Sequence, residues 1–285
     1  MNAATLSGGS VRRVMQDAGR HLPRHEVERI LSHALDLPPL ELYLHDRALP
    51  QPLCDRLSEM VRARAAGAPL QYVLGEAEFF GARFSVRPGV FIPRPETEII
   101  VEAALRAFRG VQRGGRPLRI LEFGVGSGCI AVTLARELPA CLLVGIEVSW
   151  DALAVARLNA ERQGVASRVA LIQGEWERPI RGTFDGVIAN PPYVPSAQVN
   201  RLPLEVRQEP RQSLDGGVDG LRDLRHLLGV APHVLHPGGV AVFECGEEQV
   251  PVLIRQARQA RWAAEAAALF DLANRPRGVV ITGRS

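Results

Sequence analysis

The segment "LRILEFGVGSGCIAVTLAREL", which runs from Leu118 to Leu138, joins a short apolar run to a helical pattern through three closely spaced glycines. This order predicts a strand, a glycine loop and a helix. Glycines let the backbone approach a ligand closely, and the first turn of the helix offers free N–H groups. The segment therefore predicts either a ligand-binding loop or a plain tight turn, and the glycine spacing alone leaves both open.

The alternation of apolar runs and helical segments continues toward the C-terminus. Further strands are expected at residues 141–148, 168–174, 184–190, 239–245 and 277–283. Such alternation favours βαβ units, with a parallel sheet covered by helices on both faces. The predicted fold class is α/β, a doubly wound Rossmann-like sheet whose ligands bind beyond the carboxyl ends of the strands.

The chain before this region has a different pattern. From Val11 to Gly67, apolar residues recur at helical spacing between punctuating prolines. Aromatic and β-branched residues then surround Gly81 and the pair Pro88-Gly89, which indicates a hairpin. We predict a helical domain at 1–75, a β-hairpin linker at 76–93 and the α/β domain at 94–285.

The composition is that of an ordinary soluble protein. Apolar residues make up 46% and charged residues 23% of the 285, which excludes a disordered or fibrous chain. No stretch approaches the roughly 20 apolar residues of a membrane span, and no basic segment followed by an apolar core opens the chain. We expect a cytoplasmic protein with no membrane partner.

Several kinds of catalytic site are disfavoured by composition. The four cysteines form no C-x-x-C pair, and the seven histidines show no metal-ligand spacing, so we predict no protein-bound metal. All 34 basic residues are arginine. A Schiff-base lysine and a Walker-type phosphate lysine are thereby excluded.

Two residues beyond the glycine loop favour a nucleoside ligand. Glu147 ends the next predicted strand, 19 residues beyond Gly128, where a carboxylate can accept hydrogen bonds from both ribose hydroxyls. Trp176 follows the strand after that, and its ring can pack against an adenine face. The alternatives are a solvated strand end for Glu147 and a core position for Trp176.

The tetrapeptide Asn190-Pro191-Pro192-Tyr193 ends the fourth strand of the α/β region. Proline has no N–H, so the ladder stops here and the Asn190 side-chain oxygen and Pro191 carbonyl are expected to face the ligand crevice. Two acceptors can orient a planar NH₂ group, while Pro192 stiffens the loop and the Tyr193 ring lies over the flat group that carries the nitrogen. A bare strand-ending turn is the alternative.

A nitrogen nucleophile aligned in this way requires an electrophile. S-adenosyl-L-methionine, a nucleoside with a sulfonium methyl group, fits the predicted site and needs only in-line approach of the nitrogen lone pair. We see no Ser/His/Asp or Cys/His constellation in this region, which agrees with a reaction that uses no side-chain nucleophile.

With these motifs together, the sequence resembles the glutamine methyltransferases of peptide chain release factors. The resemblance covers nearly the whole chain, and its combination of motifs is far more specific than any one of them. It rests on "QYVLGEAEFFGARFSV", "FIPRPETEIIVE", "FGVGSGCIAV", "GIEVSWDALAVARLNA", "NPPYVP", "QEPRQSLDGGVDGL", "LHPGGVAVFECGEEQ" and "DLANRPRGVV". "IPRPETE" beside the tetrapeptide separates this family from DNA adenine methyltransferases.

The resemblance implies roles for individual residues. Cofactor contacts carry over to Gly124, Val125, Gly126, Ser127, Gly128, Glu147, Trp176 and Asn190. The substrate glutamine would be held by Asn190, Pro191, Pro192 and Tyr193, of which Asn190, Pro191 and Tyr193 are the predicted catalytic residues.

The resemblance also implies a partner. The substrate would be the glutamine of the Gly-Gly-Gln loop in class I peptide chain release factors, and the helical domain would help to grip the release factor. In this chain Glu122, Glu147 and Glu175 stand where aspartates are expected. Each glutamate side chain is one methylene longer than that of aspartate, which affects the geometry of the expected contacts to the ribose of the cofactor.

Two alternatives stay open beside this leading hypothesis. An adenine methyltransferase acting on DNA or RNA would use the same tetrapeptide, but a net charge of +3 without a basic run gives a nucleic-acid partner little support. A non-catalytic methyltransferase-like module that binds translation factors is the other alternative. The intact tetrapeptide and glycine loop speak against it.

Overall fold

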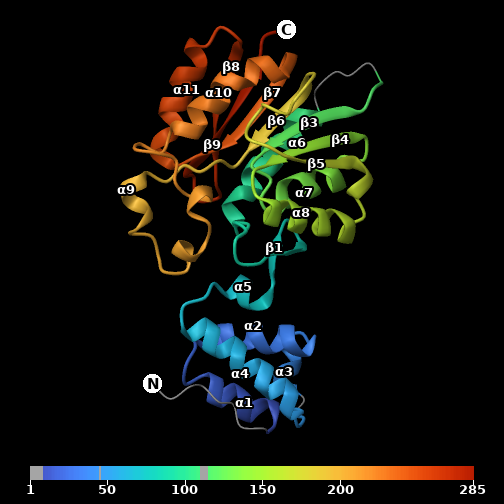
Figure 1. Cartoon of the computed structure of the whole chain (residues 1–285), viewed down its shortest axis with the longest axis vertical. Helices are drawn as coiled ribbons and strands as arrows, with labels where there is room; N and C mark the ends of the chain where they lie inside the picture. The colour runs from blue at the N-terminus through green and yellow to red at the C-terminus, as the bar shows by residue number, and fades with distance from the viewer. Residues whose placement is uncertain (1–8, 45, 110–114) are drawn as a thin grey trace. The chain divides into compact units, whose positions relative to one another are not determined.

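The computed structural model describes residues 9–44, 46–109 and 115–285. Its chain divides into two compact units (Figure 1). The first comprises 1–76 together with 203–208, and the second comprises 77–202 together with 209–285. The predicted boundaries at 75 and 93 remain a prediction, and residues 1–8 of the predicted helical domain lie outside the described part.

The first unit is helical, and prolines and left-handed residues set the ends of its helices. Pro23 and Pro50 stand at the N-caps of two helices, and Asp36 and Gly75 end two helices with φ of 51° and 75°. Buried apolar side chains such as Ile30, from the second helix, form the core of this unit. The helices are α1 (Val11–Ala18), α2 (Arg24–Leu35), α3 (Glu41–Leu44), α4 (Gln51–Ala65) and α5 (Leu70–Leu74).

One arginine connects three segments of this unit. Arg64 of α4 donates to Glu26 of α2 through two nitrogens, each 2.7 Å from a carboxylate oxygen. Its Nη2 also lies 2.6 Å from Glu205 Oε1, in segment 203–208. The pKa of Glu26 is lowered by the Arg64 hydrogen bonds. This charge cluster attaches a segment distant in sequence to the helices.

A two-stranded hairpin opens the second unit, with β1 (Glu76–Phe79) and β2 (Ala82–Ser85). Its two turn residues, Phe80 and Gly81, both have positive φ, at 50° and 69°. Two such residues form the primed turns that match the twist of paired strands. Phe79 and Phe84 are fully buried and meet edge to face, at 6.0 Å between ring centroids.

The second unit is built on a seven-stranded sheet with the order β5-β4-β3-β6-β7-β9-β8. The first five strands in this order are parallel to one another, while β9 pairs antiparallel with both β7 and β8. The predicted doubly wound α/β class is confirmed. The strands are β3 (Leu118–Phe123), β4 (Cys141–Glu147), β5 (Val169–Gln173), β6 (Phe184–Ala189), β7 (Leu235–Glu244), β8 (Ala263–Phe270) and β9 (Pro276–Gly283).

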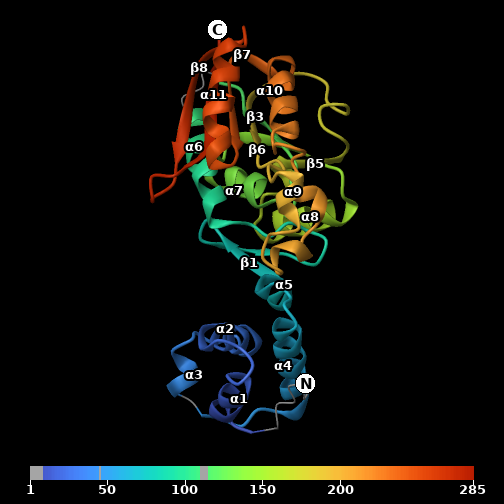
Figure 2. The same cartoon turned by 90° about the vertical axis from the view of Figure 1, so that its left-hand side faces the viewer.

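Helices cover both faces of this sheet, because successive strand residues point to opposite sides. Ile120 packs in one core with α6 (Glu98–Arg109), α7 (Cys129–Glu137) and α8 (Trp150–Arg162). Its neighbour Leu121 packs in the other core with α10 (Arg222–Val234) and α11 (Val250–Gln259). Figures 1 and 2 show these two layers of helices. Short helices connect the larger elements: η1 (Pro95–Thr97), η2 (Ala166–Arg168), α9 (Ser196–Val199), η3 (Val206–Gln208), η4 (Arg211–Ser213) and η5 (Glu247–Gln249).

The register of the sheet aligns the ends of its central strands. Phe123 pairs with Ile146 of β4 and with Ala189 of β6, and Glu147 pairs with Gln173 of β5. The segments that follow these strands therefore start from one edge of the sheet. Within residues 9–44, 46–109 and 115–285, no helix is both long and apolar enough to cross a bilayer.

Candidate active site

A cavity of about 340 Å³ lies at the carboxyl edge of the sheet, and its volume is within the range of small-molecule sites. Residues from the predicted site form a large part of its lining: Gly124, Val125, Gly126, Ser127, Glu147, Trp176, Asn190 and Pro192. Gly128, Pro191 and Tyr193 are not among the lining residues. Eight of the predicted site residues thus line one cavity, and the other three do not.

The glycine loop and Glu147 hold each other in place. Glu147 Oε2 accepts a hydrogen bond from Gly126 N at 2.9 Å, and Oε1 accepts one from Ser149 N at 3.0 Å. A carboxylate has about four lone-pair positions, so each oxygen keeps capacity for a ligand hydroxyl. The half-buried side chain is thus oriented by the backbone of two loops that line the cavity.

Gly128 serves the packing of two helices. It has φ of 81° at the N-cap of α7, and a Cβ there would lie 3.0 Å from Ala156 Cβ on α8. The close approach of α8 requires a residue without a side chain at this position.

Trp176 lies at the rim of the cavity, in the turn after β5. Its ring centroid is 6.2 Å from that of Phe123 and 4.9 Å from that of His226 on α10. Its φ is 54°, a conformation that costs a non-glycine residue about 1–3 kcal/mol. The surrounding rings hold the indole against the cavity despite this cost.

Glu122 contributes a buried carboxyl to the same cavity. Its side chain is 0% exposed, and neither carboxylate oxygen has a hydrogen-bond partner in the described part of the chain. Burial raises the pKa of Glu122 well above its usual range. A carboxyl without a partner that faces a cavity is suited to a cationic or hydrogen-donating ligand group. In the sequence, Glu122 stands out only because a glutamate occupies a position where the shorter aspartate is expected.

The amide of Asn190 is oriented by a neighbour on η1. Asn190 Nδ2 donates to Thr97 Oγ1 at 3.0 Å. Because Nδ2 faces Thr97, the side-chain oxygen is the acceptor that remains for other groups. Asn190 and Thr97 both line the cavity.

Tyr193 lies behind the cavity, held at both ends. Its hydroxyl donates to Glu244 Oε1 on β7 at 3.1 Å, and its carbonyl oxygen accepts from Gln249 Nε2 at 2.8 Å. The half-buried ring packs against the core cluster that includes residues of α10 and α11. Pro191 is buried and Pro192 is half-buried. The tetrapeptide is therefore fixed from its protein-facing side.

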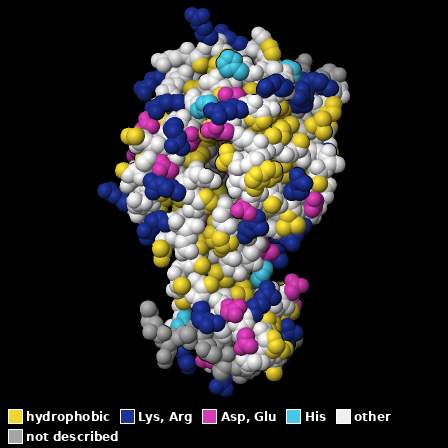
Figure 3. Space-filling view, in the orientation of Figure 1, with side chains coloured by type: hydrophobic (Ala, Val, Ile, Leu, Met, Phe, Trp, Pro, Cys, Tyr) yellow, Lys and Arg dark blue, Asp and Glu magenta, His cyan; other side chains and the backbone are white. Residues whose placement is uncertain are grey.

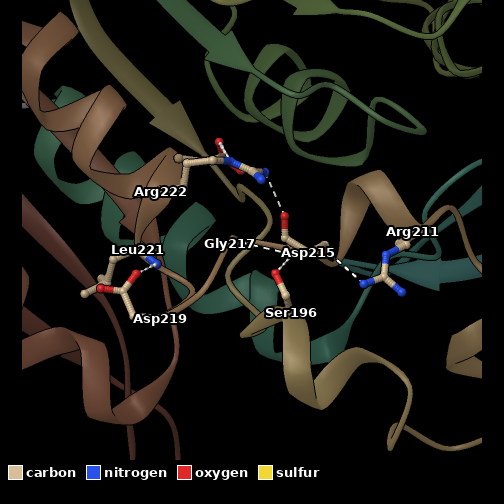
Figure 4. A network of polar contacts seen from close by, with 8 residues as sticks. Ser196, Arg211, Asp215, Gly217, Asp219, Leu221 and Arg222 are labelled. Atoms are coloured by element: carbon tan, nitrogen blue, oxygen red, sulfur yellow. Dashed lines mark hydrogen bonds and ion pairs between the residues drawn. The ribbon is translucent and has the colours of Figure 1, made fainter.

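A polar network holds the loop that follows η4 (Figure 4). Asp215 Oδ1 accepts from Ser196 Oγ at 2.6 Å and from Gly217 N at 3.0 Å. Arg211 Nη2 donates to Asp215 Oδ2 at 2.9 Å, and Arg222 Nη2 donates to the Asp215 carbonyl at 2.7 Å. The contacts from Ser196, Gly217 and Arg211 lower the pKa of Asp215, with the Ser196 hydrogen bond first among the causes.

Two glycines of this loop contact the tetrapeptide. A Cβ on Gly216 would lie 2.6 Å from Pro192 O, and one on Gly220 would lie 2.2 Å from Tyr193 O. Gly216 N also donates to Val194 O at 2.9 Å. The loop therefore supports Pro192 and Tyr193 through direct backbone contact.

Two segments quoted above only for family resemblance meet at the site. Glu209 of "QEPRQ" is buried, accepts from Ile92 N at 3.0 Å, and forms an ion pair with Arg94 of "IPRPETE". Phe91, Pro93 and Thr97 from the latter segment line the cavity. Sequence reasoning assigned these residues no role, because their contacts join parts of the chain far apart in sequence.

Within the described residues, no group of three His, Cys, Asp or Glu side chains could hold a metal ion. The arrangement offers a nucleoside-sized cavity, backbone N–H groups, an oriented amide acceptor and the carboxyl side chains of Glu122, Glu147, Glu175 and Asp223.

Comparisons with known proteins give this geometry a context. The model of the PrmC N-terminal domain matches residues 10–75, and the model of the Methyltransferase small domain matches residues 100–209. The chain is 43% identical over 243 residues to the release factor glutamine methyltransferase of Geobacter sulfurreducens, covering 84% of this chain and 83% of that one. It is 42% identical over 245 residues to the protein of the same name from Moorella thermoacetica, covering 85% and 84%.

Solved structures show the same fold at lower identity. A methyltransferase from Pyrococcus furiosus matches with a TM-score of 0.52 at 21% identity, over 73% of this chain and 91% of that one. A T. Thermophilus 16S rRNA methyltransferase, solved in complex with AdoMet and guanosine, matches with a TM-score of 0.51 at 19% identity. It covers 73% of this chain and 50% of that one.

Proposed function

This chain belongs to the family of release factor glutamine methyltransferases, and from that premise we propose that it methylates the glutamine of the Gly-Gly-Gln motif in class I peptide chain release factors. The methyl group would pass from the sulfonium of S-adenosylmethionine to the side-chain amide nitrogen, which would lose one proton to solvent, and the thioether S-adenosylhomocysteine would be the leaving group. The observation that carries the proposal is the Asn190 amide, held by Thr97 so that its oxygen is the acceptor at the cavity.

The residues of the cavity fit this cofactor. Glu122 is a buried carboxyl without a partner in the described chain, which suits the ammonium or sulfonium charge of the cofactor. Glu147 keeps lone pairs for the ribose hydroxyls, and Trp176 offers a ring to the adenine. The bound cofactor would supply a sulfonium methyl group, an electrophile that needs no metal or side-chain nucleophile.

The chain's own groups would act on the substrate nitrogen. The Asn190 oxygen and the Pro191 carbonyl accept the two hydrogens of the glutamine amide, which directs the nitrogen lone pair away from them. Pro192 and Tyr193, supported from behind, keep these acceptors fixed during the reaction. Preorganised acceptors of this kind accelerate a reaction because they require no rearrangement as charge develops.

The helical unit would bind the body of the release factor. The turn before α3 and the end of that helix expose Leu40 and Leu44, at 70% and 64%. Exposed apolar side chains on one short element are suited to a protein partner. On the face shown in Figure 3, arginines are interspersed with acidic side chains, as expected for a surface that does not bind nucleic acid.

Mass spectrometry tests the proposal directly. A class I release factor is incubated with the enzyme and S-adenosylmethionine, then digested and sequenced. We expect one added methyl group, on the Gly-Gly-Gln glutamine. A release factor with glutamate at that position should remain unmodified, since a carboxylate has no amide nitrogen to accept the methyl.

Two results would overturn the proposal. One is methyl transfer to adenine in duplex DNA or RNA, which would favour the adenine methyltransferase alternative. The other is cofactor binding without transfer to any release factor, which would favour a non-catalytic module.

A further inference from the structure

Two buried side chains stand behind the tetrapeptide and contact both of its ends. Thr97 ends η1 and is 1% exposed, and Glu244 ends β7 and is 3% exposed. The motifs of the tetrapeptide and the glycine loop contain neither residue. Both are polar groups in an apolar interior, where a polar group is costly unless it is hydrogen-bonded.

Each of the two residues accepts one hydrogen bond from the tetrapeptide. Asn190 Nδ2 donates to Thr97 Oγ1 at 3.0 Å, and Tyr193 Oη donates to Glu244 Oε1 at 3.1 Å. The Thr97 hydroxyl also lies near enough to the Glu244 carboxyl to lower its pKa. Thr97 thus holds the Asn190 amide, and Glu244 holds the Tyr193 hydroxyl.

Thr97 determines which way the Asn190 amide points. Its hydroxyl oxygen accepts from Asn190 Nδ2, and the nearby Glu244 carboxyl favours turning the hydroxyl hydrogen away from Asn190. A flipped amide would place Asn190 Oδ1 against a lone pair of this hydroxyl. Thr97 therefore keeps Nδ2 on its own oxygen and leaves Oδ1 for the substrate amide.

We propose that Thr97 and Glu244 are positioning residues for methyl transfer, which act by fixing the amide orientation of Asn190 and the hydroxyl of Tyr193. This inference rests on the proposed function for its substrate. It adds a buried carboxyl on the last parallel strand to the machinery of the reaction.

The ionisation of Glu244 links this role to pH. Burial raises the pKa of Glu244 to about 7, against the opposite effect of its hydrogen bonds from Thr97 and Tyr193. The charge of Glu96 raises the pKa of Glu244 further, and the charge of Arg277 lowers it. Glu244 in turn helps to raise the pKa values of the Cys245 and Cys129 thiols. The ionised carboxylate accepts from the Tyr193 hydroxyl and attracts the hydrogen of the nearby Thr97 hydroxyl, whereas the protonated acid gives one oxygen to its own proton.

A matched pair of variants at Thr97 tests the positioning. Thr97→Val keeps the shape but removes the hydroxyl, and Thr97→Ser keeps the hydroxyl. We expect Thr97→Val to lower kcat on a Gly-Gly-Gln peptide by about 10², as a misplaced reacting group does, and Thr97→Ser to restore most of it. KM and cofactor affinity should change much less than kcat in both variants.

The pH profile tests Glu244. The wild-type kcat should fall as pH is lowered through about 7. Glu244→Gln should have a lower kcat at high pH and should lose this titration. An unaltered profile in Glu244→Gln, or equal kcat in the two Thr97 variants, would overturn the inference.

A measurement without substrate separates this inference from the proposed function. In protein labelled with ¹⁵N-asparagine, the Asn190 side-chain amide should shift and exchange faster with water in Thr97→Val but not in Thr97→Ser. An unchanged Asn190 amide in Thr97→Val refutes the positioning even if release factor is methylated. If wild-type enzyme methylates no Gly-Gly-Gln glutamine, the proposed function fails, while the amide resonance still decides the orientation of Asn190.

Discussion

At the scale of single residues, sequence patterns can indicate a site residue when it lies at the end of a predicted strand. Glu147 and Asn190 were placed at the cavity because the carboxyl ends of parallel strands share one edge of a sheet. Thr97 and Glu244 could not be found in this way. Their contacts with the tetrapeptide span 93 and 51 residues of sequence, and no local pattern carries such information.

The first prediction concerns Asn190. Asn190→Ala removes one acceptor for the substrate amide, and we expect kcat to fall by about 10² to 10³. Affinity for S-adenosylmethionine should change little, because Glu147 and the glycine loop hold each other independently. Methyl-transfer kinetics and calorimetry measure the two effects. Near wild-type turnover in a folded variant would contradict the role given to this residue.

The second prediction concerns stability and pH. The pKa of Glu244 is raised from 4.5 to about 7, so the folded chain holds this proton more tightly than the unfolded chain. Its stabilising contribution is complete below about pH 4.5 and is lost as pH rises through about 7, with a difference of about 3 kcal/mol. Glu244→Gln removes the titrating group. The unfolding free energy of this variant, relative to wild type, should therefore rise between pH 4.5 and pH 8.

Denaturant titrations across this pH range measure the difference. Glu265→Gln, on the exposed side of β8, is the matched control and should track wild type at each pH. Parallel curves for wild type and Glu244→Gln would contradict the assigned ionisation.

At the scale of elements, the strands of the parallel sheet were predicted well, and β8 was missed. Its sequence "AAEAAALF" is rich in alanine, which has the highest helix propensity and a low strand propensity. It becomes a strand because a turn at Asp271 returns the chain along β9. The Asp271 carboxylate accepts from Ala273 N and Arg275 N, both at 2.9 Å. Tertiary pairing here overrides the local preference.

The third prediction concerns the loop that supports the tetrapeptide. Gly220 has φ of 72°, and a Cβ would lie 2.2 Å from Tyr193 O. Gly164 has nearly the same φ, 70°, but a Cβ there meets no atom within 4 Å. A substitution at Gly164 therefore tests backbone strain alone, whereas one at Gly220 tests backbone strain together with steric contact.

Gly164→Ala should cost about 1–2 kcal/mol of stability through its left-handed conformation and leave kcat unchanged. Gly220→Ala should cost at least about 1 kcal/mol more and lower kcat, because Tyr193 must move. Thermal unfolding and methyl-transfer rates measure both. Equal effects of the two substitutions on rate would show that the loop does not support the site.

At the scale of the whole molecule, sequence patterns separated a helical region from an α/β region. They did not predict that segment 203–208, which lies within the α/β region of the sequence, belongs to the helical unit. This assignment depends on contacts such as the Arg64–Glu205 ion pair, which joins residues 141 positions apart. Hydrophobic periodicity reports local structure and carries no signal of such a pair.

The fourth prediction concerns the release factor. Replacing both Leu40 and Leu44 by glutamate places charge on the exposed apolar surface of the helical unit. We expect KM for intact release factor to rise about 10-fold or more, as loss of anchoring apolar residues weakens an interface. KM for a short Gly-Gly-Gln peptide should not change. Leu272→Glu, at a still more exposed leucine between β8 and β9, is the control.

The discontinuity of the helical unit has a consequence for biosynthesis. Residues 9–76 leave the ribosome before segment 203–208, so Arg64 can meet Glu205 only after more than a hundred further residues have been made. Domains generally fold as units during synthesis. Here the N-terminal unit acquires its full set of contacts only when the chain has passed Asn190 and its neighbours. Completion of the helical unit is thus coupled in time to the emergence of the catalytic tetrapeptide.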